Sequence, residues 1–176
     1  FPEAATNMPS LDIAASWIVV GDTATYNNAV PHFQQAGKAI YCYNGKRPAS
    51  GSFAVEDDGV ALRELAWGQF KKGIKRWFFW ESTYYNDYQS GRGQNDLFNN
   101  ALTFGGASSI DNIIGETGWN HSNGDGVLMF PGTDRVIAGD SYGVMGPFAS
   151  LRMKHWRRGI QDIDYVTLSN AINAAQ

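Results

Sequence analysis

The sequence has 176 residues and a mass of 19.3 kDa, with 43% hydrophobic and 18% charged residues. This composition predicts one globular domain and excludes a disordered chain. The formal net charge of −3, without a concentrated Lys/Arg face, argues against a nucleic-acid partner, and no apolar run is long enough to span a bilayer. Six Trp and eight Tyr suit stacking on sugar rings, and equally a core rich in aromatic side chains.

Cys42 is the only cysteine, so no disulfide can form within the chain. It lies in an apolar segment, which favours a small buried hydrophobe over a nucleophile. The sequence starts at Phe1 without Met or a signal peptide. We therefore expect a processed or truncated product, and the compartment stays open, with secretion or a periplasmic location among the options.

The first half of the sequence alternates between strand and helix patterns. Apolar runs predict three strands, over residues 11–20, 38–43 and 74–80. The helix predicted between the first two, over residues 22–37, should be broken by Pro31. The next helix begins at Glu56-Asp57-Asp58 and ends at Lys71-Lys72-Gly73, in agreement with the helix dipole and a glycine C-cap. Its predicted buried face consists of Leu62, Leu65, Ala66 and Phe70.

The last helix is predicted to begin near Pro147 and Ser150. Its apolar stripe recurs at helical spacing, at Met153, Trp156, Ile160 and Ile163. Arg158 and Asp162 are spaced for an ion pair between successive turns on the solvent side. The preceding segment, residues 81–146, is rich in Gly, Asn and Asp and contains one predicted strand, 127–130.

Continuous apolar strands separated by amphipathic helices favour a parallel sheet that is covered on both faces. We count three β/α units, with a long inserted loop before the last helix. The predicted fold class is therefore α/β, in a single domain over residues 1–176.

The order of motifs in the last third is more specific. It reads Gly124-Asp125-Gly126, an apolar strand, Pro131-Gly132, then Pro147-Phe148-Ala149-Ser150-Leu151-Arg152, and finally Arg157-Arg158-Gly159-Ile160-Gln161-Asp162-Ile163-Asp164-Tyr165. This order resembles the C-terminal part of glycoside hydrolase family 123-like catalytic domains. The resemblance implies that the three units are the C-terminal portion of a (β/α)8 TIM barrel, in a partial barrel cut from a longer chain.

Three units do not close a barrel, and an open parallel sheet leaves free edges. We therefore expect the missing barrel half or a dimer partner; a smaller self-contained α/β arrangement is the alternative.

In barrel enzymes the working face lies at the C-terminal ends of the strands. Tyr41, Tyr43 and Asn44 end the second predicted strand, where alternation directs Tyr41 and Tyr43 to the side opposite Cys42. Sugar stacking and core packing explain these tyrosines about equally well.

Trp80 and Glu81 end the third predicted strand, and Tyr84 and Tyr85 follow. A carboxylate that emerges from an apolar strand beside Trp80 is a candidate for a raised pKa. Glu81 could then protonate the departing oxygen of a glycoside, or bind sugar hydroxyls. A structural salt bridge to Arg152 or Arg63 is the competing interpretation.

A third cluster contains Trp119, His121 and Asp125 and is similar to a sugar-binding loop. Because Asp125 stands between Gly124 and Gly126, a role in fixing the loop backbone is the stronger interpretation for it. Arg152 matches the arginine of the family ending. It could reach the strand-end face, but a structural role, anchoring Asp125 or Asp162, is the stronger interpretation.

No cluster of residues has metal-ligand spacing, so we expect no metal and no cofactor, with calcium in the long loop as an open alternative. The resemblance implies a catalytic Asp-Glu pair on an earlier strand, with Glu as general acid and Asp orienting the 2-acetamido group. No Asp-Glu dipeptide occurs in this sequence. Enzymatic activity therefore stays uncertain.

The sequence thus predicts a glycoside hydrolase-like domain that contributes one wall of a glycan-binding site, with N-acetylhexosamine-containing sugars as candidates. A non-catalytic carbohydrate-binding or scaffold module is the alternative. A domain for phosphorylated ligands has less support, because no Gly-rich phosphate loop follows a predicted strand.

Overall fold

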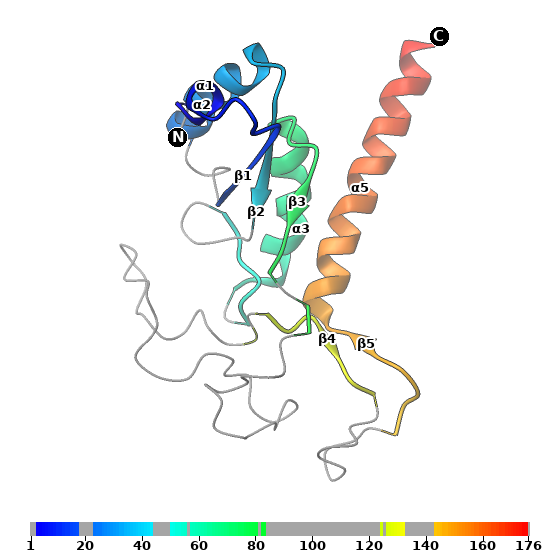
Figure 1. The fold of residues 1–176 in the computed structure, drawn as a ribbon. Helices are drawn as coiled ribbons and strands as arrows, with labels where there is room; N and C mark the ends of the chain where they lie inside the picture. Colours follow the sequence, from blue (N-terminus) through cyan, green and yellow to red (C-terminus); the bar gives the residue numbers. More distant parts are fainter. Residues whose placement is uncertain are drawn as a thin grey trace, which may run out of the picture.

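The computed structural model describes residues 3–17, 23–43, 50–55, 57–80, 82–83, 124, 126–132 and 143–175. The helices are α1 (Ala4–Asn7), α2 (Thr23–Gln35), α3 (Gly59–Lys71) and α5 (Leu151–Ala174). The strands are β1 (Ile13–Trp17), β2 (Ala39–Tyr43), β3 (Trp77–Phe78), β4 (Met129–Phe130) and β5 (Phe148–Ala149). The fold is α/β, as the sequence predicts (Figure 1).

A parallel three-stranded sheet, in the order β1-β2-β3, forms the centre of this arrangement. Ile13 pairs with Ala39, and Cys42 pairs with Trp77. The predicted parallel pairing is confirmed. The third strand is shorter than predicted, since β3 covers only Trp77–Phe78.

One face of the sheet is buried beneath helices. Cys42 and Trp77, which are partners in the register, lie on this face and are both buried. The core around them takes side chains from α2, α3 and α5, namely Val30, Leu62, Leu65, Met153 and Trp156. Ala14 lies on the same face, against Ala5 of α1 and Phe33 of α2. All four described helices therefore pack on this side.

Among the described residues, no helix packs on the opposite face of the sheet, which we call the open face. It carries Tyr41 and Tyr43, which are partly buried, and Ile13 and Phe78, which are 49% and 46% exposed. The prediction that both faces are covered is wrong for the described part of the chain, where helices cover one face only. An apolar strand indicates which environment suits it, but not which element supplies that environment.

Two helix ends lie where the sequence predicts them. At the end of α3, Gly73 has φ = +67°, and the N–H groups of Gly73 and Ile74 donate to the carbonyl oxygens of Phe70 and Gln69. This pattern is a Schellman motif, which requires a left-handed residue after the helix. At the start of α5, the hydroxyl of Ser150 accepts a hydrogen bond from the N–H of Met153, so Ser150 is the N-cap and the predicted start of this helix is confirmed.

The predicted break at Pro31 is wrong, because α2 runs without interruption from Thr23 to Gln35. Proline removes one N–H, which leaves the carbonyl of Asn27 without its helical partner. Asn27 and Pro31 are both exposed, so water can bond to that carbonyl.

The most extensive contact between elements is the crossing of α3 and α5. Gly159 is buried there, and a Cβ atom at this position would overlap the carbonyl oxygen of Arg63. Ile160, which the apolar stripe placed in the core, is exposed, because the contact passes through its neighbour Gly159. Phe70 is also exposed, contrary to prediction, and Ile74 fills the core at that end of α3 instead.

We predict that Gly159→Ala lowers the free energy of unfolding by about 1–3 kcal/mol, because the methyl group overpacks the crossing. In a helix without this contact, Gly→Ala would raise stability by about 1 kcal/mol. Urea unfolding monitored by circular dichroism measures the change. Ser169→Ala, on the exposed part of α5, is the control and should be close to neutral. A stabilised Gly159→Ala variant would contradict the close crossing.

Candidate functional site

Arg152, in the first turn of α5, ties the connections after β2 and β3 to the start of that helix. Its guanidinium group donates to the carbonyl oxygens of Phe53, Gly124 and Val127, at 2.6 Å for Gly124 and 2.5 Å for Val127. Phe53 follows β2 in the chain, whereas Gly124 and Val127 follow β3. Arg152 thus anchors backbone carbonyl groups. Of its two predicted partners, Asp162 pairs with Arg63 instead, and Asp125 lies outside the described residues.

Phe53 reinforces this junction with its ring. The ring is buried and stacks on Phe79, with 3.9 Å between ring centroids, and meets the edge of Trp156 at 5.0 Å. Phe79 directly follows β3, and Trp156 lies in α5. One side chain therefore joins the chain segments that leave the C-terminal ends of β2 and β3.

Only a glycine fits at position 124 of this junction. Its φ of +70° disfavours other residues, and a Cβ atom would come within 2.7 Å of both the Arg152 guanidinium and the Val55 side chain. The expectation of tight turns at Gly124 and Gly126 is confirmed, since Gly126 has φ = +78°.

The segment after β3 is held by a second small sheet. The N–H groups of Leu128 and Met129 both donate to the carbonyl oxygen of Ser82, at 2.9 Å. Strand β4 pairs antiparallel with β5, and the rings of Phe130 and Phe148 stack across the pair. The predicted strand at 127–130 is confirmed in its second half. Sequence analysis missed β5, which is only two residues long and directly precedes the N-cap of α5.

The aromatic residues predicted for the site lie at the end of β2 and just after β3. Tyr41 contacts Phe78, with 5.9 Å between ring centroids, and Tyr43 is the register partner of Phe78. These three residues therefore share the open face of the sheet. Trp80, two residues beyond β3, is partly buried. Sequence analysis missed Phe78, although strand alternation from buried Trp77 would have found it.

The remaining predicted site residues, together with Asn44, lie outside the described part of the chain: Glu81, Tyr84, Tyr85, Trp119, His121 and Asp125. Arg63, one of the salt-bridge partners considered for Glu81, pairs with Asp162.

An ion pair joins α3 and α5. Arg63 donates to both carboxylate oxygens of Asp162, at 2.5 and 3.0 Å, and the Asp162 side chain is only 13% exposed. The predicted partner, Arg158, lies 3.8 Å from the same carboxylate. Chiefly because Arg63 donates to it, the pKa of Asp162 lies below its ordinary value.

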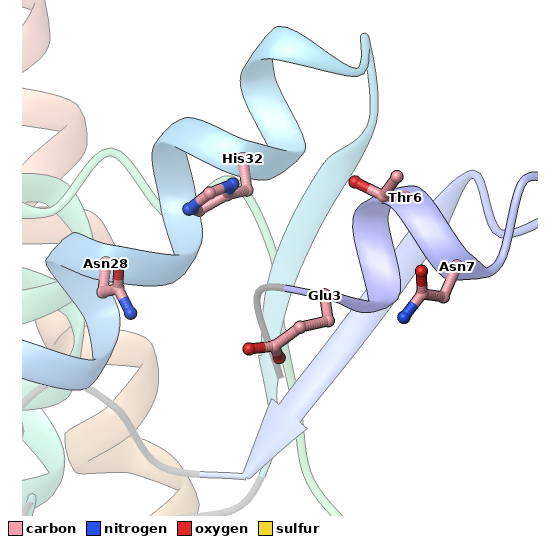
Figure 2. A pocket seen from close by; sticks show the side chains of 5 residues that line it. All are labelled: Glu3, Thr6, Asn7, Asn28 and His32. Atoms are coloured by element: carbon pink, nitrogen blue, oxygen red, sulfur yellow. The ribbon is translucent and has the colours of Figure 1, made fainter.

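A polar pocket lies between α1 and α2, at the opposite end of the sheet from the junction at Arg152 (Figures 1 and 2). Sequence analysis did not identify this pocket. The spacing of Asn28 and His32, four residues apart on one helix face, is the signal that could have indicated a shared surface.

Two further properties hold for the described residues alone. They contain no group of three or more His, Cys, Asp or Glu side chains that could hold a metal ion. None of their helices has the length and apolarity that a bilayer span requires.

Comparison with known proteins gives no family assignment. No family model matches the chain, and the search of curated proteins finds no significant match. The resemblance to glycoside hydrolase family 123-like domains therefore stays a prediction that rests on the motifs of the last third.

We predict that Arg152→Met lowers the free energy of unfolding by about 3 kcal/mol, because carbonyl groups of the junction lose a charged donor. Thermal unfolding of the purified protein measures the loss. Arg157→Met, on the exposed side of the same helix, is the matched control and should change stability little. Equal effects of the two substitutions would contradict the anchoring role.

We predict that Asp162→Asn removes part of the acid sensitivity of the fold. Because the folded pKa is depressed, the contribution of Asp162 is present above its ordinary pKa of about 4 and is lost as the pH falls below that value. Urea midpoints measured from about pH 6 to pH 2 should therefore fall less steeply in the variant. The control is Asp164→Asn, at an exposed neighbour. A variant that kept the full pH dependence would show that Asp162 is not its source.

Proposed function

We propose that this chain is a glycoside hydrolase-like domain that contributes one wall of a glycan-binding site at the C-terminal ends of β2 and β3. The observation that carries the proposal is the open aromatic face. Tyr41, Tyr43 and Phe78 share this face, and Trp80 lies two residues beyond the end of β3. Sugar rings present apolar faces that stack on aromatic rings, whereas their hydroxyl groups need polar partners.

The one-sided sheet supports the barrel part of this proposal. Parallel sheets occur almost only where both faces are covered. Here the helices lie on one face, and Ile13 and Phe78 are exposed on the other. In a (β/α)8 barrel, helices cover the outer face of the sheet and further strands enclose the inner one. We infer that the open face is an inner face, and that the missing barrel half or a partner subunit covers it.

The backbone that carries the proposed glycan site is held in place by contacts on both of its segments. Arg152 and Phe53 fasten the segments that follow β2 and β3, so the aromatic residues at these strand ends stand on fixed backbone. Fixed geometry matters because a rigid site loses little conformational entropy when a ligand binds.

Whether Glu81 is catalytic distinguishes the enzyme hypothesis from the hypothesis of a binding module. Its position after an apolar strand and beside Trp80 favours a general acid or a ligand for sugar hydroxyls. The Asp-Glu pair implied by the resemblance is absent from this sequence, which favours sugar binding without catalysis by this chain alone. If this chain only binds the sugar, the residues that catalyse glycoside hydrolysis come from the rest of the barrel.

We predict that Trp80→Ala weakens binding of the N-acetylglucosamine disaccharide by about tenfold, because a stacking platform is lost. Isothermal titration calorimetry on the whole chain measures the affinity. Tyr165→Ala removes an exposed aromatic ring from the distal half of α5 and should leave affinity unchanged. If the disaccharide binds the two variants equally well, stacking at Trp80 is excluded.

A further inference from the structure

The polar pocket between α1 and α2 has a volume of about 420 Å³. It is lined by Glu3, which directly precedes α1, by Thr6 and Asn7 of α1, and by Asn28 and His32 of α2. Figure 2 shows the carboxylate of Glu3 and the hydroxyl of Thr6 reaching toward α2. The side chains of two separate helices therefore face one space.

The position of α1 is fixed by hydrogen bonds and by packing. Lys38, just before β2, donates to the carbonyl oxygens of Met8 and Pro9, at 2.7 and 3.2 Å. Ala5 of α1 is buried against Phe33 of α2. The two walls of the pocket are thus held at a set distance, which a preformed binding site requires.

The chemistry of the lining favours neutral hydroxyl groups. The amides of Asn7 and Asn28 and the hydroxyl of Thr6 each both donate and accept hydrogen bonds, and Glu3 accepts them. Hydroxyl groups of a sugar or polyol do the same, so neighbouring hydroxyls can pair with one amide. An anion would meet the carboxylate of Glu3, and the described lining holds no Lys or Arg that could bind the anion. For a cation, Glu3 and His32 lack a third His, Cys, Asp or Glu within the described residues.

We propose that this pocket binds a small neutral polyhydroxyl ligand, of the size of a monosaccharide or cyclic polyol. Its volume falls in the usual range for ligand sites, about 300–1,000 Å³. The lining residues are exposed and provide no aromatic platform. Hydrogen bonds must therefore supply the affinity in competition with water, and we expect a dissociation constant on the order of 1 mM.

This inference does not rest on the proposed glycan site. The pocket adjoins the N-terminal ends of the strands, where α1 leads into β1 and Lys38 leads into β2. Tyr43 and Trp80 lie at or beyond the opposite ends of β2 and β3. Either site can exist without the other, and a ligand at one does not touch the other.

Amide NMR spectra of the whole chain, titrated separately with glucose and with myo-inositol, test the proposal. We expect saturable shifts of the side-chain amide signals of Asn7 and Asn28. Asn28→Ala and Glu3→Gln should each weaken binding about fivefold, the equivalent of one hydrogen bond. Gln34→Ala, an exposed α2 residue outside the lining, should change the affinity by less than about twofold.

Three results would overturn the proposal. The first is the absence of shifts at Asn7 and Asn28 at about 100 mM of either polyol, far above the expected dissociation constant. The second is a response of these amides to zinc or calcium but to neither polyol, which would identify a cation site. The third is shifts confined to Tyr43 and Trp80, which would support the strand-end site while excluding the pocket. Shifts at the pocket alone would support it and count against the strand-end site for these ligands.

Discussion

The crossing of α3 and α5 at Gly159 is the contact on which the rest of the structure depends. Without a side chain at this position, the backbone of α5 approaches the carbonyl of Arg63, whose guanidinium group reaches across to Asp162. The same helix begins at Ser150 and carries Arg152 in its first turn, where Arg152 binds the connections after β2 and β3. Helix α5 therefore joins the core of the domain to the ends of its strands (Figure 1).

This arrangement leaves the two faces of the sheet unequal. The helices are concentrated on the Cys42 side, so the side that bears Tyr41 and Phe78 has no helix of the described chain against it. An exposed aromatic face on a parallel sheet is costly for an isolated domain, because apolar area stays in water. We attribute this cost to a barrel interior that this chain shares with the missing barrel half or a partner subunit. We propose the rim of that interior, at Tyr43 and Trp80, as the glycan site.

Sequence reasoning succeeded where the cause is local. The glycine at Gly73 and the serine at Ser150 define helix ends through hydrogen bonds to nearby backbone groups, so their sequence patterns were sufficient. It failed where the cause is distant in the chain. The predicted pair of Asp162 with Arg158 is confirmed, but its shorter contact is with Arg63, which is 99 residues away, and no local spacing indicates that contact. The open sheet face has the same origin, since an apolar strand does not show what covers it. Most of the predicted site lies outside the described residues, so only its β2 and β3 portions could be compared.

Backbone hydrogen exchange, measured with and without the N-acetylglucosamine disaccharide, tests the central claim most directly. A ligand held at the strand ends excludes water and stabilises the local backbone, so exchange should slow over residues 39–43 and 77–83. The account predicts this protection, with little change in the distal half of α5. Unchanged exchange at both strand ends at saturating disaccharide would contradict the proposal that they form the wall of a glycan site.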